Sequence, residues 1–219
     1  IEMRHFSDQA IYAQIDAILD EDSPKKIVTF ACNWCSYAGA DTAGVSRMAY
    51  PPNARIIRTM CSGRVNPEFV WYAFQKGAPV VLVSGCHYVD CHYIDANRST
   101  VRRVDGLWNG LEKAGIRADR LLLEWCSAAE GARWQTIMHA TEKKRETVTR
   151  DELEFTRNVL AKARVPRPRK PKPADENQEA DFVCLRCGHR WEAVFGVERE
   201  RICAQCRSNC VRWLQKTKK

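Results

Sequence analysis

Several features that define common functional classes are missing from this chain of 219 residues. No apolar run approaches the roughly 20 residues that a membrane-spanning helix needs, so we expect no membrane span. No basic and then apolar leader with a small-residue cleavage site is present, which argues against secretion and favours a cytoplasmic location. No paired acids, nucleophile beside a base or Gly-rich phosphate loop stands out, so we expect no substrate-converting site.

Cysteine, in contrast, is abundant, with 11 residues. Without an export signal, metal binding or redox chemistry is a better expectation for them than disulfides. The stretch "ACNWC" at 31–35 holds Cys32 and Cys35 in a C-x-x-C spacing. That spacing alone leaves three possibilities open: a redox-active dithiol, half of a zinc site, or half of an iron–sulfur site.

The net charge of +8 is concentrated towards the C-terminus. Residues 181–219 hold nine basic and four acidic residues, and residues 161–173 hold six basic residues and no acid. An anionic partner is therefore expected to meet this part first. Before residue 181, prolines alternate with basic residues. We interpret residues 164–180 as an extended, Pro-rich basic linker between the N-terminal part of the chain and its C-terminal module.

Four short apolar runs indicate strands that are buried on both faces, at 26–31, 54–60, 79–84 and 120–125. Helical patterns follow them, at 66–77 with Asn66 as its cap, at 97–115, and after two expected capping boxes at 127–130 and 149–152. This alternation predicts an α/β fold, a small doubly wound, flavodoxin-like parallel sheet over residues 25–163. The expected spatial order of the strands in the sheet is two, one, three, four.

The N-terminal residues 1–24 contain an amphipathic helix that Ser7 can cap. Its apolar stripe consists of Ile11, Ile15, Ile18 and Leu19. A lone surface helix would expose this stripe, so we interpret it as a docking helix for a partner protein.

Each predicted strand runs directly into a cysteine, namely Cys32, Cys61, Cys86 and Cys126. Parallel strands end on one side of the sheet, where ligands of open α/β sheets bind. Together with Cys35 and Cys91 in the following loops, these thiols are expected to lie on one rim. Cys126 would lie about three strand spacings, or ~14 Å, from Cys61, so we interpret it as a buried thiol.

Any four of the remaining five cysteines could ligate zinc or an iron–sulfur cluster. These five are Cys32, Cys35, Cys61, Cys86 and Cys91. A thiol–disulfide oxidoreductase would use only Cys32 and Cys35 and would leave the other three unexplained. His87 and His92 directly follow cysteines, so we expect them to point elsewhere, with a hydrogen bond to a cluster sulfur as their best role.

The stretches "CNWCSYAGADTAG" (32–44), "RTMCSGRVNPEFV" (58–70), "GCHYVDCHYIDANRSTVRRV" (85–104) and "LEWCSAAEG" (123–131) resemble the delta subunit family of methyl-viologen-reducing hydrogenase. The resemblance implies an electron-transfer subunit with one 2Fe–2S cluster. It also implies partners: a hydrogenase or formate dehydrogenase-type module on one side and a heterodisulfide reductase A-like flavoprotein on the other, often in an electron-bifurcating complex. Ala31 departs from the family, since many members carry a cysteine there, and so does Cys126, which is usually aliphatic.

The C-terminal residues 181–219 contain two further C-x-x-C motifs. Cys184, Cys187, Cys203 and Cys206 are the expected ligands of a zinc ribbon, with Gly188 permitting a tight turn and Cys210 in surplus. A rubredoxin-type iron centre uses similar spacing and remains an alternative. So small a module needs its metal to fold.

Two other classes of function compete with electron transfer. A zinc-ribbon nucleic-acid-binding or scaffolding protein would fit the basic C-terminal part, but no base-reading helix or aromatic ladder is apparent, so protein docking is preferred. A thiol–disulfide oxidoreductase using Cys32 and Cys35 is the other.

Overall fold

The computed structural model describes residues 6–162, 179–194 and 201–214. At its centre lies a parallel sheet of β1 (Ile27–Cys32), β2 (Ala54–Thr59), β3 (Val80–Gly85) and β4 (Leu121–Trp125), in the order β2-β1-β3-β4. This order confirms the predicted doubly wound α/β fold. Strands β1, β3 and β4 are buried along their whole length, which explains why their sequences are continuous rather than alternating apolar runs.

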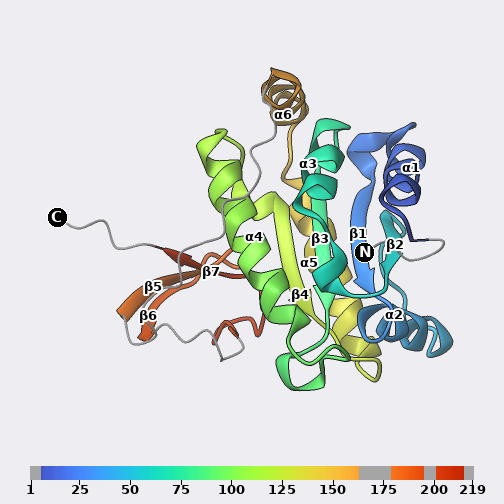
Figure 1. Ribbon diagram of the computed structural model, residues 1–219, viewed down its shortest axis with the longest axis vertical. Coiled ribbons are helices and arrows are strands. Elements are labelled where there is room, and N and C mark those ends of the chain that lie inside the picture. Colours follow the sequence, from blue (N-terminus) through green and yellow to red (C-terminus); the bar gives the residue numbers. More distant parts are fainter. Residues whose placement is uncertain (1–5, 163–178, 195–200, 215–219) are drawn as a thin grey trace.

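Helices cover both faces of this sheet (Figure 1). On one face lie α1 (Asp8–Leu19), α3 (Pro67–Gln75) and α4 (Ala96–Lys113). On the other lie α2 (Ser36–Val45) and α5 (Gly131–Glu146), while α6 (Arg150–Lys162) packs on α3. Short 3-10 turns lie between these elements at Ser23–Lys25, Ser62–Arg64, Tyr88–Asp90 and Ala118–Arg120.

Two of the expected helix caps after the strands are confirmed, at Asn66 and at Thr149. The Asn66 side chain accepts the amide of Glu68, and Thr149 and Glu152 cap one another through both side chains. The expected start at 127–130 is wrong, because α5 begins at Gly131. There the Glu130 carboxylate accepts the Ser127 amide at 2.7 Å, so the two residues close a turn before the helix instead of opening it.

The interpretation of α1 as a docking helix for a partner is wrong. Ile11, Ile15 and Leu19 are buried in the same core as the sheet, against α3 and β2. Burial of such side chains stabilises the fold by about 1.5–3 kcal/mol each, so the stripe serves this domain itself. Ser7 caps the helix as expected, and its side chain accepts the Ala10 amide.

The C-terminal module is a small antiparallel sheet of β5 (Glu179–Cys184), β6 (Arg190–Val194) and β7 (Val211–Leu214), in the order β6-β5-β7. Most of the linker expected at 164–180 lies outside the described residues. The module lies beside β4 and α4 (Figure 1), and Cys210 is buried in the core of the α/β domain.

Arginines of the module face acids of the α/β domain. Arg201 pairs with Asp105, and Arg212 pairs with Glu112. The expectation that the basic C-terminal part would be turned towards an anionic partner therefore needs correction for these side chains, because acids of the same chain neutralise them. Burial raises the pKa of Asp105, and Arg201 opposes that rise.

Within the described ranges, no helix combines the length and the apolar character that crossing a membrane requires.

Candidate metal centres

The first group of thiols lies where β1 and β3 end. Cys32 is the last residue of β1, Cys86 directly follows β3, and Cys35 precedes α2. The sulfur atoms of these three cysteines lie within 4.8 Å of one another, and those of Cys32 and Cys86 are 3.7 Å apart. Cys91 is half-buried and packs against the group. The parallel strands thus bring two cysteine pairs that are about 50 residues apart in sequence together at the carboxyl ends of β1 and β3, a site that we term the rim.

Buried polar side chains fix the loops that carry these thiols. The amide of Asn97, on α4, donates to the carbonyls of Cys86 at 3.2 Å and His87 at 2.9 Å. Ser36 donates to the carbonyl of Gly85 at 3.1 Å and accepts from Ser84 at 2.8 Å. These residues escaped the sequence analysis, although Ser36 and Asn97 stand close to the cysteine motifs.

The other two strand-end cysteines have different surroundings. Cys61 caps the turn at Ser62–Arg64, where its sulfur accepts the Gly63 amide at 3.3 Å, and it is outside the group of three. Burial raises its pKa to about 11. Cys126 is a fully buried thiol outside the group, as predicted, and burial raises its pKa to about 12.

The close thiols of the rim share their protons unequally. Hydrogen bonds from Cys35 and then Cys86 lower the pKa of Cys32 to about 3. The same contact with Cys32 raises the pKa of Cys35 to about 12 and also raises the pKa of Cys86. Thiols this close favour at most partial ionisation without a cation, and a bound cation would displace their protons.

Aromatic side chains join the two cysteine loops over the rim. The rings of Trp34 and His92 stack at 4.0 Å, and the Trp34 indole donates to the Tyr93 hydroxyl at 3.3 Å. The other histidine of these loops, His87, pairs with Glu130 at 2.8 Å. The exposed apolar side chains of these loops and of α2's first turn form what we term the rim patch: Trp34, Tyr37, Val89, Tyr93 and Ile94.

The second group lies in the C-terminal module. The sulfur atoms of Cys184, Cys187, Cys203 and Cys206 lie within 4.8 Å of one another. Each knuckle contributes one sulfur to each of the two closest pairs, because Cys184 is 3.6 Å from Cys206 and Cys187 is 3.6 Å from Cys203. Four thiols so close fit a single tetrahedral metal ion, since thiolates at such a site need a shared cation.

The two knuckles have the same backbone turn. Gly188 has a φ of 79° and its amide donates to the Cys184 carbonyl, while Arg207 has a φ of 59° and its amide donates to the Cys203 carbonyl. Glycine adopts this left-handed conformation freely, whereas a residue with a side chain adopts it at a cost of about 1–2 kcal/mol. The repeat of the turn despite that cost indicates that it serves the cysteines.

Burial raises the pKa of Cys184 and raises that of Cys206 to about 11. Burial acts in the same direction at Cys203, but the amides of Cys206 and Gln205 outweigh it and hold the Cys203 pKa below its usual value. Amide donors at a knuckle thus favour the thiolate form that binds metal.

A doubly wound sheet whose strand ends gather thiols defines a cysteine-rich, flavodoxin-like α/β protein. The model of the family "Methyl-viologen-reducing hydrogenase, delta subunit" matches residues 27–148. The chain belongs to this family, which confirms the resemblance seen in the sequence. The match ends before β5, so the four-cysteine module lies outside it.

Its relatives fall into two groups, and the first consists of hydrogenase subunits. The chain is 52% identical over 119 residues to the iron-sulfur subunit of the vhc F420-non-reducing hydrogenase of Methanococcus voltae, covering 54% of this chain and 83% of the relative. The iron-sulfur subunit of the F420-non-reducing hydrogenase of Archaeoglobus profundus is 44% identical, over 55% of this chain and 88% of the relative.

The second group consists of heterodisulfide reductase proteins. In Methanosarcina acetivorans, the A component of the ferredoxin/F(420)H(2)-dependent CoB-CoM heterodisulfide reductase is 46% identical over 147 residues. The match covers 67% of this chain but only 18% of the relative. The chain therefore corresponds to a small segment of that much longer protein.

Proposed function

We propose that this chain is an electron-transfer subunit that carries a 2Fe–2S cluster at its rim. The observation that supports this most is the convergence of thiols from the ends of β1 and β3, with Cys32, Cys35 and Cys86 within 4.8 Å. Both groups of relatives, the hydrogenase iron-sulfur subunits and the heterodisulfide reductase proteins, agree with it.

The partners we propose follow from the same two groups. The subunit would relay electrons between a hydrogenase or formate dehydrogenase-type module and a heterodisulfide reductase A-like flavoprotein, in a complex that bifurcates electrons. The chain matches only 18% of the heterodisulfide reductase relative, so these assignments rest on one segment of it.

We propose Cys32, Cys35, Cys86 and Cys91 as the four ligands, because Cys91 packs against the other three. Cys61 is the fifth candidate, and its sulfur is already engaged by the Gly63 amide. A 2Fe–2S cluster, when bound by four thiolates, exchanges single electrons.

The residues around the thiols serve this role in two ways. Asn97 and Ser36 hold the cysteine loops through buried hydrogen bonds, which keeps the ligand atoms in place. The rim patch presents exposed aromatic and aliphatic side chains directly beside the thiols, and such side chains are typical of protein interfaces. A redox partner that docks there reaches the rim.

A thiol–disulfide oxidoreductase is the second candidate. The C-x-x-C pair of Cys32 and Cys35 between β1 and α2 favours it, together with the lowered pKa of Cys32, because a thiolate is the attacking species. It leaves the approach of Cys86 and Cys91 without a purpose.

For the module we propose one zinc ion held by Cys184, Cys187, Cys203 and Cys206. Four thiolates from two knuckles suit zinc, and a rubredoxin-type iron is the competing occupant. Nucleic acid is not a proposed partner, because Arg201 and Arg212 pair with acids of the α/β domain.

Metal and sulfide analysis of anaerobically purified protein, with its visible spectrum, tests these assignments. We expect iron and acid-labile sulfide in equal amounts, visible absorption that bleaches on reduction, and zinc in addition. Iron near zero together with a redox-titratable Cys32–Cys35 disulfide would favour the oxidoreductase. Iron without sulfide would favour the rubredoxin-type centre in the module.

A further inference from the structure

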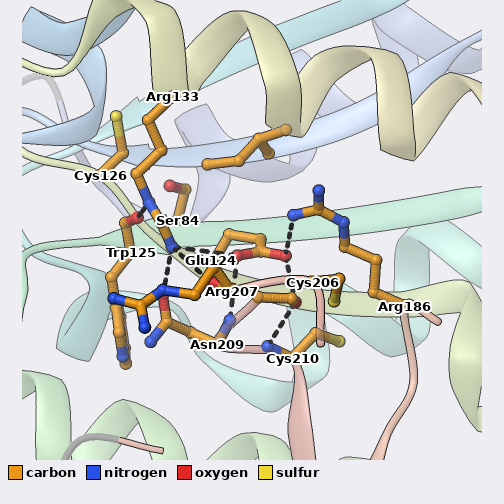
Figure 2. Close-up of polar contacts among 12 residues, drawn as sticks. Ser84, Glu124, Trp125, Cys126, Arg133, Arg186, Cys206, Arg207, Asn209 and Cys210 are labelled. Atoms are coloured by element: carbon orange, nitrogen blue, oxygen red, sulfur yellow. Dashed lines mark hydrogen bonds and ion pairs between the residues drawn. The ribbon is translucent and has the colours of Figure 1, made fainter. Parts of the chain in front are cut away.

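The buried carboxylate of Glu124 is the point where the α/β domain meets both knuckles of the module (Figure 2). Glu124 lies on the edge strand β4, and its side chain is 2% exposed. A buried carboxylate is costly unless charged partners and hydrogen bonds compensate it. The groups around Glu124 therefore show how the cost of burying its charge is compensated.

Each knuckle provides part of that compensation. From the first knuckle, the Arg186 guanidinium lies 3.4 Å from the carboxylate. From the second, the Ser208 hydroxyl donates at 2.5 Å and the Asn209 amide at 3.2 Å. Arg186 lies between the ligand candidates Cys184 and Cys187, and Ser208 and Asn209 follow Cys206 within three residues.

The α/β domain supplies one cation of its own. Arg133, on α5, lies 3.6 Å from the Glu124 carboxylate and also donates to the Asn209 side chain at 2.6 Å. Its guanidinium donates further to the Trp125 carbonyl at 2.5 Å (Figure 2). The carboxylate thus has partners from α5 and from both knuckles, and only the knuckle partners depend on how the two turns are placed relative to each other.

A metal ion ligated by both knuckles fixes that relative placement. Arg186 and Asn209 are 23 residues apart and meet one carboxylate only when Cys184 and Cys187 lie beside Cys203 and Cys206. The core that the module has besides its cysteines is small, with Phe182 and Val211 as its buried apolar residues in the cluster. Packing within the module is therefore a weak substitute for the metal.

We propose that metal binding in the four-cysteine module and docking of the module on Glu124 are thermodynamically coupled, so that the loaded module is a clamp on the β4 edge. This rests on the proposed metal site of the module and is independent of the cluster at the rim. Because coupling is reciprocal, loss of the Glu124 charge must weaken metal binding, and loss of metal must free the knuckles from Glu124.

The first arm of the test measures zinc affinity in the full chain by competition with a chromogenic chelator. Glu124→Gln keeps the shape of the side chain and removes its charge, and we expect the module's zinc affinity to fall by about tenfold or more. Asp119→Asn is the matched control, because Asp119 precedes β4 and pairs with Lys144 and Arg117. We expect the affinity of the control variant to be unchanged.

The second arm measures hydrogen exchange of the Asn209 backbone amide, which donates to the Glu124 carboxylate, with and without zinc. We expect protection with zinc and fast exchange after its removal. Equal zinc affinities of Glu124→Gln and the parent chain, or an Asn209 amide that stays protected without metal, would overturn the coupling alone. A chain whose four-cysteine module binds no metal would overturn the metal site and the coupling together.

Discussion

The thiols of the rim are held by loops after the buried strands of a large core, whereas those of the module are held by two turns beside a core of a few side chains. In the rim, side-chain hydrogen bonds from Asn97 and Ser36 fix the loops. In the module, the second knuckle donates hydrogen bonds to Glu124 of the neighbouring domain. From this difference we expect the fold to hold the rim thiols in place before a metal binds. We expect the thiols of the module to be held by the proposed metal and by the contacts with Glu124.

The largest expected effect lies at the rim and tests whether its thiols are ligands. Cys86→Ser should abolish or strongly destabilise the visible chromophore, because Cys86 contacts Cys32 at the centre of the group. The protein should stay folded, since the sheet does not depend on the ligand. Absorption and electron paramagnetic resonance spectra of anaerobic preparations measure this.

Cys126→Ser is the matched control, because Cys126 also follows a strand but is buried outside the group. Its chromophore should equal that of the parent chain. Equal spectra for both variants would contradict the assignment of Cys86.

The second prediction concerns metal removal and separates the two regions. A strong chelator should abolish the ordered structure of β5–β7, because the module's own core is too small to fold alone. The α/β domain should keep its secondary structure, because Cys210 is the one cysteine that the described part of the module contributes to its core. Limited proteolysis with and without chelator measures the difference, and a module that resists cleavage without metal would show that docking suffices.

Part of this architecture can be predicted from sequence. The strands are located within about one residue because burial on both faces demands an uninterrupted apolar run, a signal that tolerates little shift. The common rim follows from parallel pairing of the strands, and the strand order follows from the flavodoxin-like topology that we assumed. Both knuckles follow from local spacing, which fixes the distance between Cys184 and Cys187 whatever surrounds them.

Other features depend on which surfaces meet, and sequence periodicity does not record that. The stripe of Ile11 and Ile15 has the same pattern whether it packs on its own sheet or on a partner. The dock on Glu124 is invisible in the sequence for the same reason, because one acid in an apolar strand reveals no partner. The expectation at Glu130 fails because a local turn competes with a helix start for the same carboxylate.

The third prediction tests the core that supports the rim. Ile15→Ala should lower the free energy of unfolding of the α/β domain by about 2–5 kcal/mol, because Ile15 is fully buried. Ile18→Ala, on the same helix but only partly buried, should cost clearly less. Denaturant unfolding followed by far-UV circular dichroism measures both. A negligible loss for Ile15→Ala would restore the idea that this helix docks elsewhere.

The smallest expected effect contrasts an exposed ion pair with the buried one at Glu124. Hydrogen bonds from Lys76 and then Tyr72 hold the pKa of Asp16 below its ordinary value of 3.8. A carboxyl with a lowered folded pKa contributes stability above its unfolded pKa, and this contribution is lost as the pH falls through the folded pKa.

Asp16→Asn should therefore reduce stability at neutral pH and leave it unchanged in strong acid. Because the Asp16 side chain is 44% exposed, solvent screening limits the loss to about 1 kcal/mol or less. Asp20→Asn is a control of opposite sign, since an acid at the C-terminal cap of α1 opposes the helix dipole and its removal should be neutral or slightly stabilising. Unfolding measured across pH distinguishes the two, and an Asp16→Asn loss that persists at low pH would indicate packing rather than charge. A loss for Asp16→Asn well above 1 kcal/mol would contradict the view that pairing of an exposed carboxylate contributes little to stability.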